Sequence, residues 1–554
     1  MPTVSAHVAH TIAAHLDHVF GVMGNGNAWF LDALGRETDV RFTAVRHEAG
    51  GVVAADAHFR ASGRLAAATA TYGAGFTNTL TALAEAVQAE VPLLLVVGDQ
   101  PTAGRRAWDV DQIALASAVG ARTFTVGRTD AAATVILAIE HAIARRTAAV
   151  IALPYDVAAI EAGPLTAAPA LVEPTPLVPA GAFATRAVAE MAASLASAAR
   201  PLLLAGRGAW LAGAGEALGE LAEATGAITA STALGRGVFP DHRYDLGVTG
   251  GFGADGAMAL VRDADVVVVF GASLNQFTMR FGELFSPGTV VHQVDVTPTA
   301  TNACVGGFVR GDAAVVARAL VHELRAIGSG GSGWRESVDV AALLRRETGG
   351  DARGLADDGR LDPRAVAVRI ADLLPEDRVV VSDGGHFIGW ANMYWPVASP
   401  ERMIMVGTAF QSIGMGFPSV AGAAAARPES VVVLSTGDGG GLMALADLES
   451  AVRSARGRGI AVVWNDAAYG AEVNLYGLLG LDDAPMRIPE VDFAELADAV
   501  GAEGVVVREL ADLDRLAEWS RRPVDERRFL LLDCRISGDV IAPYQQEIIA
   551  VNRR

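Results

Sequence analysis

A carboxylate and an amide side chain occupy matching places near the C-terminus of this chain. Gly437-Asp438-Gly439 follows the apolar, β-branched run 431–434, and Asn465, 27 positions after Asp438, follows the similar run 460–464. The amphipathic stretch 442–456 between them predicts a helix, and a strand–helix–strand unit of this kind has parallel strands. We therefore expect Asp438 and Asn465 at the carboxyl edge of one sheet, where such sheets bind ligands.

The two oxygen ligands and the glycines beside them indicate one kind of chemistry. One carboxylate and one amide oxygen suit Mg²⁺, which keeps water and substrate phosphate in its other positions. Gly439, Gly440 and Gly441 allow the backbone to approach a phosphate at a helix N-terminus. An ordinary glycine-rich turn is the alternative, but the placement of Asn465 after a second strand favours a metal and phosphate site.

The elements that position these residues form an α/β protein. With 554 residues the chain is too long for one core, and strand-like and helix-like segments alternate along it. A Pro/Ala-rich stretch at 154–179 and a flexible Gly/Ser run at 328–333 divide it into predicted domains of 1–170, 180–330 and 355–554. Each has the size of a doubly wound parallel-sheet domain. The middle one resembles a Rossmann sheet, but it lacks G-x-G-x-x-G after its first strand, which favours a structural role.

Composition excludes several classes of function. The formal charge of −19 argues against nucleic-acid and anionic-membrane partners. All 44 basic residues are arginines, so a lysine Schiff base and a P-loop lysine are both excluded. Cys304 and Cys534 stand apart in apolar contexts, which predicts neither a zinc site nor a disulfide. No apolar run approaches the ~20 residues that cross a bilayer. We expect a soluble cytoplasmic protein.

The spacing of Gly437-Asp438-Gly439 and Asn465 resembles the diphosphate-metal motif of thiamine diphosphate (ThDP) enzymes. Further segments fall in the order seen in the ThDP-dependent decarboxylase and acetolactate synthase superfamily. They are 20–24, Arg46-His47-Glu48, 71–78 and 90–98. The resemblance covers essentially the whole chain. It implies an N-terminal pyrimidine-binding domain, a central domain and a C-terminal diphosphate-binding domain.

The resemblance also implies roles for individual residues in holding ThDP and Mg²⁺. Glu48 takes the place of the glutamate that bonds pyrimidine N1′ and promotes the ylid, the nucleophile of these enzymes. Ile413 takes the place of the bulky residue that bends the cofactor, and Ala467 that of a third metal ligand through its carbonyl, beside Asp438 and Asn465. The remaining implied cofactor contacts are Gly73, Ala74, Asn78, His386, Gln411, Gly437, Gly439, Gly440 and Tyr469.

The implied reaction opens with attack on a 2-oxo acid and passes through an enamine, and its last step has two outcomes. Decarboxylases carry an aspartate at Asn25 and a His-His pair near Arg105, and both are missing, whereas Glu472 stands where they have a proton relay. The segment 107–111 is similar to acetolactate synthases. We expect carboligation to a carbonyl acceptor, with simple decarboxylation as the alternative. Expected substrate-pocket residues are Asn25, Gln100, Trp108 and Glu472.

Family resemblance further implies a homodimer or homotetramer with active sites between subunits, Glu48 from one chain facing Asp438 and Asn465 of another. Flavin-contacting features are not apparent in 271–280, so FAD is not expected. Two other functions stay open: a non-catalytic ThDP-binding paralogue, and a flavin or nicotinamide oxidoreductase built on the central domain.

Overall fold

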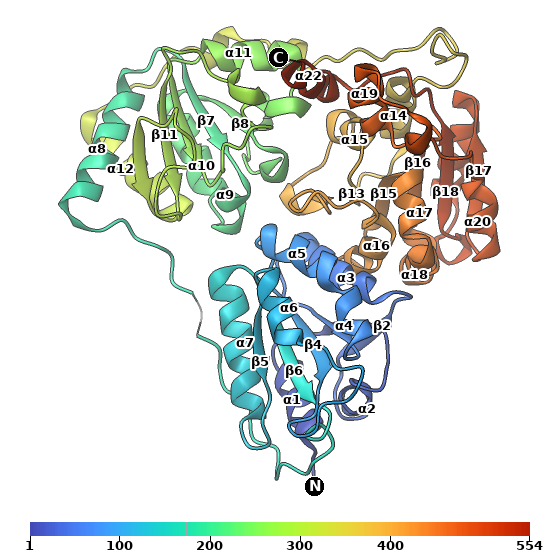
Figure 1. Ribbon diagram of the computed structural model, residues 1–554. Coiled ribbons are helices and arrows are strands. Elements are labelled where there is room, and N and C mark those ends of the chain that lie inside the picture. The colour runs from blue at the N-terminus through green and yellow to red at the C-terminus, as the bar shows by residue number, and fades with distance from the viewer. Residues whose placement is uncertain (173, 554) are drawn as a thin grey trace.

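Three six-stranded parallel sheets, each flanked by helices, build the chain (Figure 1). The computed structural model describes residues 1–172 and 174–553. Glu173, within the predicted linker, lies outside them. The sheets run from β1 to β6, β7 to β12 and β13 to β18, and each falls within one predicted domain. The domain boundaries themselves stay predictions. No helix of the described ranges is long and apolar enough to cross a membrane.

The N-terminal sheet has the order β2-β1-β3-β4-β6-β5. Its strands are β1 (His18–Gly21), β2 (Arg41–Ala44), β3 (Ala67–Ala70), β4 (Leu93–Asp99), β5 (Arg122–Thr125) and β6 (Ala148–Pro154). Its helices are α1 (Val4–Ala13), α2 (Ala28–Glu37), α3 (Glu48–Ser62), α4 (Ala74–Asn78), α5 (Leu80–Gln88), α6 (Gln112–Ala118) and α7 (Ala131–Arg145). The long strands β4 and β6 are buried along their whole length, as expected for strands covered by helices on both faces.

The central sheet has the order β12-β11-β10-β7-β8-β9, which is the Rossmann order that its sequence resembles. Its strands are β7 (Pro201–Ala205), β8 (Ile228–Ser231), β9 (Asp245–Val248), β10 (Val266–Phe270), β11 (Val290–Asp295) and β12 (Gly307–Arg310). Its helices are α8 (Gly181–Ser197), α9 (Arg207–Leu211), α10 (Gly215–Thr225), α11 (Asp255–Asp263) and α12 (Ala313–Ile327).

The C-terminal sheet has the order β14-β13-β15-β16-β18-β17. Its strands are β13 (Arg378–Ser382), β14 (Met403–Met405), β15 (Val431–Gly437), β16 (Gly459–Asn465), β17 (Glu503–Val507) and β18 (Leu530–Arg535). Its helices are α14 (Pro363–Leu373), α15 (Ile388–Tyr394), α16 (Gly416–Ala426), α17 (Asp438–Met443), α18 (Leu448–Ala455), α19 (Gly470–Leu475), α20 (Phe493–Ala499), α21 (Asp514–Arg521) and α22 (Pro543–Asn552), while α13 (Val340–Leu343) precedes this domain.

The first and third sheets share one topology, because their strands occur in the same spatial order when each is numbered from its own start. Helix α3 follows the second strand of its sheet, and α16 follows the second strand of the other. These two equivalent helices pack against each other, and their buried apolar residues belong to one core (Figure 1). Gly422 of α16 permits this approach, since a Cβ there would lie 1.9 Å from the Ala54 carbonyl oxygen.

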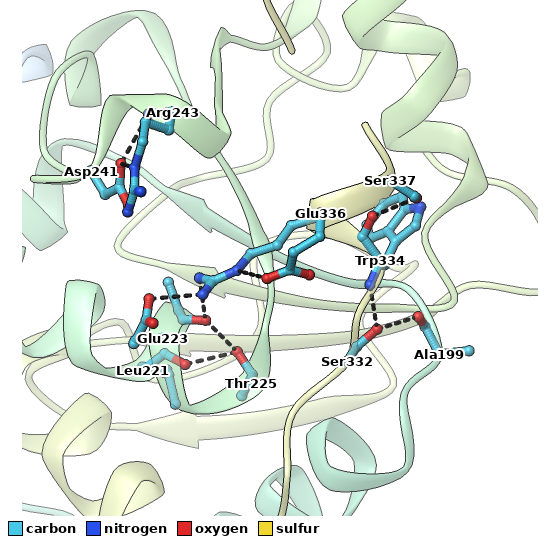
Figure 2. A network of polar contacts seen from close by, with 12 residues as sticks. Ala199, Leu221, Glu223, Thr225, Asp241, Arg243, Ser332, Trp334, Glu336 and Ser337 are labelled. Atoms are coloured by element: carbon cyan, nitrogen blue, oxygen red, sulfur yellow. Dashed lines mark hydrogen bonds and ion pairs between the residues drawn. The ribbon is translucent and has the colours of Figure 1, made fainter. Parts of the chain in front are cut away.

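The Gly/Ser run predicted as a flexible segment lies against the central domain. Ser332 donates from its hydroxyl to the Ala199 carbonyl at 2.6 Å, and from its backbone to the Thr225 carbonyl at 2.8 Å. Arg335 pairs with both Glu223 and Glu336, and Figure 2 shows these two glutamates near Ser332 and Trp334. These contacts hold residues 332–335 against α10, ahead of the C-terminal domain.

Candidate active site

Asp438 and Asn465 stand at the ends of two hydrogen-bonded strands, as their sequence contexts predict. β15 and β16 pair in parallel with Gly437 opposite Trp464, so Asp438 begins α17 directly beyond the first strand and Asn465 ends the second. The stretch predicted as one helix is divided into α17 and α18, with a short 3₁₀ turn at Leu445–Asp447. This division leaves the strand–helix–strand arrangement intact.

The side-chain oxygen of Asn465 is buried and lacks a partner among the described residues. Its amide nitrogen donates to the Val491 carbonyl at 3.1 Å and to Asp533 Oδ1 at 2.9 Å, and these bonds fix which atom is the oxygen. A buried oxygen without a donor costs about 1–3 kcal/mol. A bound cation would remove that cost, so this atom fits a metal ligand.

Asp438 provides the negative charge that such a cation requires. Burial, together with the neighbouring charge of Asp466, raises its pKa to about 7, and burial raises the pKa of Asp466 to about 6. Two neighbouring carboxylates repel each other when both are ionised. A bound cation offsets that repulsion and so favours the ionised forms. The donor set, a carboxylate and an amide oxygen, suits Mg²⁺.

Ala467 contributes to this site through its backbone. Its φ is +56°, in the left-handed region that costs a non-glycine residue about 1–2 kcal/mol. Its backbone N–H supports the Asp438 carboxylate. Its carbonyl accepts a hydrogen bond from the Ile488 N–H at 2.9 Å, which leaves that oxygen one lone pair for the predicted metal bond.

Side chains pack closely against glycines next to the pair. A Cβ on Gly439 would lie 2.6 Å from the Tyr469 ring, and one on Gly470 would lie 3.2 Å from His386 Nδ1. His386 Nε2 accepts from the Ala542 N–H at 3.2 Å, and burial lowers the ring pKa to about 4. The ring is therefore neutral at pH 7, with its hydrogen on Nδ1, and can donate to a phosphate oxygen as predicted.

The loop 407–415 carries the predicted wedge residue, and a buried carboxyl group holds its end. Ile413 packs over Gly384, where a Cβ would lie 3.3 Å from Ile413 Cγ2, and Gln411 is exposed with φ of +56°. Asp383 accepts hydrogen bonds from Gly384 N at 2.8 Å, from Met415 N at 3.2 Å and from Thr436 Oγ1 at 3.1 Å. This one carboxyl group joins the ends of β13 and β15 to the loop.

The start of the same loop is held by the N-terminal domain. Glu85 of α5 accepts from Phe410 N at 2.7 Å and from Ala409 N at 3.4 Å. Arg60 of α3 bridges Glu85 at 3.1 Å and donates to the Met405 carbonyl at 2.7 Å. All of these charged groups are buried, so the contact joins the two domains without access of water.

Glu48 opens helix α3, as its sequence context predicts, and its carboxylate accepts a hydrogen bond from Asn78 at 2.9 Å. Residues 74–78 form the short helix α4 rather than the predicted loop. Gly73, with φ of +60°, turns the chain into that helix, and its N–H donates to Gln112 Oε1 at 2.7 Å. Two residues predicted to contact a pyrimidine, Glu48 and Asn78, thus meet.

Two of the predicted substrate residues meet through a cluster around Arg106. Asn25 donates to the Tyr72 hydroxyl at 2.8 Å, and the Arg106 guanidinium lies 4.0 Å from the Tyr72 ring centroid and 5.8 Å from that of Trp108. Trp108 is 62% exposed. Gln100 follows β4 and its N–H donates to the side chain of Asp99.

Glu472 lies apart from that cluster, exposed on α19 of the C-terminal domain. More broadly, no hydrogen bond or ion pair of the described chain joins the site residues of the N-terminal domain to those of the C-terminal domain. Residues next to these sites connect the two domains. Arg46 N donates to Asp447 Oδ1 at 2.8 Å, and the Arg46 side chain pairs with Glu449 at 2.7 Å.

Sequence reasoning missed four residues that shape the site: Asp383, Asp466, Glu85 and Tyr72. Asp383 directly follows strand β13 and precedes His386 by three positions, and Asp466 adjoins Asn465, so an acid close to a predicted site residue was an available signal. Tyr72 lies within segment 71–78, which carries part of the resemblance, whereas Glu85 acts on a loop far away in the sequence and no local pattern marks it.

Three segments of the chain match models of known protein families. Residues 2–121 match the N-terminal TPP binding domain of thiamine pyrophosphate enzymes, residues 188–320 the central domain, and residues 383–534 the C-terminal TPP binding domain. The chain is 26% identical over 542 residues to the acetolactate synthase isozyme 3 large subunit of Escherichia coli, covering 94% of this chain and 92% of that protein.

Two further relatives extend the comparison. A probable acetolactate synthase large subunit of Methanocaldococcus jannaschii is 27% identical over 522 residues, with 88% of this chain and 84% of that protein covered. The sulfoacetaldehyde acetyltransferase of Rhodobacter capsulatus is 28% identical over 571 residues, with 96% and 94% covered.

Proposed function

Because this chain belongs to the thiamine pyrophosphate enzyme family, as a ThDP-dependent enzyme related to acetolactate synthases, we propose that it joins carbon fragments. The donor is a 2-oxo acid, and the acceptor is a second carbonyl compound. The observation that carries the proposal is the placement of Asp438 and the buried Asn465 oxygen, which has no partner among the described residues, at the ends of adjacent strands beside the glycines of α17. This is a site for a cation and a diphosphate.

The residues divide the work of holding the cofactor. Asp438 and Asn465 would hold Mg²⁺, His386 would donate from Nδ1 to the diphosphate, and Ile413 would support the bent cofactor. The bound cofactor supplies a nucleophilic carbon and an electron sink. Glu48 would hydrogen-bond the pyrimidine ring nitrogen, and the hydrogen bond that it accepts from Asn78 orients its carboxyl group before the cofactor arrives.

The active unit is a homodimer or a homotetramer of such dimers. Glu48 of one chain completes the site that Asp438 and Asn465 begin in another. Supporting this assembly, Glu48 and the metal pair share no direct contact within the described chain. Large apolar side chains are also exposed at the edges of both half-sites, with Met443 59%, Trp108 62% and Phe410 48% exposed.

Carboligation is favoured over release of a free aldehyde. The Asn25 amide cannot act as a general acid, and the residue stands where decarboxylases place a catalytic aspartate. The names of two of the compared relatives, an acetolactate synthase and a sulfoacetaldehyde acetyltransferase, also support transfer to an acceptor. Simple decarboxylation, with Glu472 as proton relay, is the competing outcome.

A panel of 2-oxo acids with ThDP and Mg²⁺ tests the proposal, with CO₂, free aldehyde and hydroxyketone measured separately. Hydroxyketone as the main product supports carboligation, and aldehyde in equal amount to CO₂ supports decarboxylation. Glu48→Gln should lose turnover by at least about 100-fold, since general acid–base groups contribute about 10²–10⁴. Glu216→Gln, at the exposed first turn of α10, is the matched control. Wild-type rates in Glu48→Gln would contradict the mechanism.

A further inference from the structure

A cluster of two histidines and an aspartate lies in the N-terminal domain, away from the residues proposed to hold the cofactor. His18 begins β1, Asp17 precedes it, and His58 lies in the second half of α3. The proposed cofactor residues follow the carboxyl ends of the strands, whereas His18 is at the amino end of its strand. We propose that Asp17, His18 and His58 bind a divalent transition-metal ion such as Zn²⁺.

The distances fit a shared ion. One potential ligand atom from each residue lies within 4.8 Å of the others. His18 Nδ1 and Asp17 Oδ1 are 3.0 Å apart and hydrogen-bonded, and a tetrahedral ion with both ligands at about 2.1 Å would replace that hydrogen bond with a spacing of about 3.4 Å. The His18 and His58 rings are 5.2 Å apart at their centroids, so the two imidazoles face one small space.

His58 supplies the independent observation. The residue is fully buried, and its Nε2 has no hydrogen-bond partner in the part of the chain that the structure describes. Its other nitrogen, Nδ1, lies 3.2 Å from the Arg64 carbonyl and donates to it, which leaves a lone pair on Nε2. Burial lowers the pKa of this ring to about 4, so the lone pair is free at neutral pH.

Arg64 forms hydrogen bonds with two of the three proposed ligands. Its carbonyl fixes the tautomer of His58, and its guanidinium Nη1 contacts Asp17 Oδ2 at 2.6 Å. Oδ1 of the same carboxylate is the oxygen nearest His18 and is the one offered to the ion. Metal-bound histidines and carboxylates typically have such outer partners, which orient them. The guanidinium charge lowers the affinity, so micromolar rather than tighter binding is expected.

The ligand chemistry separates this site from the magnesium site. Two imidazoles and one carboxylate suit Zn²⁺, Co²⁺ or Ni²⁺, whereas Mg²⁺ prefers oxygen ligands alone. With three protein ligands, the fourth position of the ion is left to water. The bound ion would join the start of β1 to α3, the helix that Glu48 opens, and so stabilise the N-terminal domain.

Titration of the full-length, chelator-treated protein with Co²⁺ and Zn²⁺ in excess Mg²⁺ tests the proposal. Visible Co²⁺ bands and competition with a chromophoric chelator report binding without any need for catalysis, so the result is independent of the proposed function. One equivalent per chain is expected. Asp17→Asn, at an exposed position, and His58→Gln should each weaken binding at least about tenfold, because changes to the outer partners of ligands already cost about 10- to 100-fold.

His10→Gln is the matched control, because His10 is a partly exposed histidine of α1 that pairs with Glu37 instead. It should leave binding unchanged. The proposal is overturned if the wild-type protein binds no Zn²⁺ at micromolar concentration, or if Asp17→Asn binds as tightly as the wild type. Equal weakening by His10→Gln would also overturn it, since binding would then be non-specific.

Discussion

Magnesium binding to the cofactor-free protein should release a proton at pH 6 and almost none at pH 8. The reason is Asp438, whose pKa is raised from 3.8 to about 7 by burial and by Asp466. A metal ion binds the ionised carboxylate, so the proton that Asp438 carries below pH 7 must leave. With a pKa near 7 the carboxyl group is roughly nine-tenths protonated at pH 6 and about one-tenth protonated at pH 8.

The same shift has a stability consequence of known sign. A carboxyl group whose pKa rises on folding stabilises the folded state below its unfolded pKa, and that contribution is lost as the pH rises through the folded value. For Asp438 the window runs from pH 3.8 to about 7, and the three-unit shift corresponds to about 4 kcal/mol. Asp438→Asn should therefore stabilise the magnesium-free protein more at pH 8 than at pH 5.

Calorimetric titration with Mg²⁺ in two buffers of different ionisation enthalpy measures the number of protons released. The apparent affinity should also fall about tenfold for each pH unit below 7. Asp466→Asn removes the neighbouring acid and should move this midpoint to lower pH, while Asp438→Asn should abolish binding. Equal proton release at pH 6 and pH 8, or a midpoint unmoved by Asp466→Asn, would refute the reasoning.

Two further changes test the junction between the outer domains. Glu85→Ala removes the acceptor of the Phe410 N–H, and loss of a charged hydrogen bond of about 1.5–3 kcal/mol should speed amide exchange at Phe410 by about 10- to 150-fold. Glu85→Gln, which keeps an oxygen acceptor, should have a smaller effect, and identical exchange in both variants and the wild type would contradict the role. Gly422→Ala forces a Cβ against the Ala54 carbonyl and should cost about 1–3 kcal/mol, seen as a lower Tm. Gly35→Ala, at an open site in α2, is the control and should be neutral or stabilising by up to about 1 kcal/mol. An unchanged Tm in Gly422→Ala would show that the two helices separate without cost.

Local pattern was enough to locate the ends of the strands that carry the site. Apolar runs that lead into a polar residue predicted Asp438 and Asn465 at the carboxyl ends of neighbouring strands, and β15 and β16 confirm that arrangement. The three parallel sheets and the Rossmann order of the central one were also predicted. These features depend on residues close together in the sequence, because short continuous apolar runs mark strands that are buried on both faces.

Residue types and spacing, then, determined a chain of three α/β domains with an acid and an amide at one sheet edge. Only the tertiary structure decided the orientation of the Asn465 side chain. Its amide nitrogen donates to Asp533, 68 residues away, and this bond leaves the side-chain oxygen buried without a donor among the described residues. It also decided that Glu85 accepts a hydrogen bond from the backbone of Phe410, 325 residues further along the chain. Such contacts come from the packing of whole domains, and the energy that selects them is spread over surfaces which no local stretch of sequence contains.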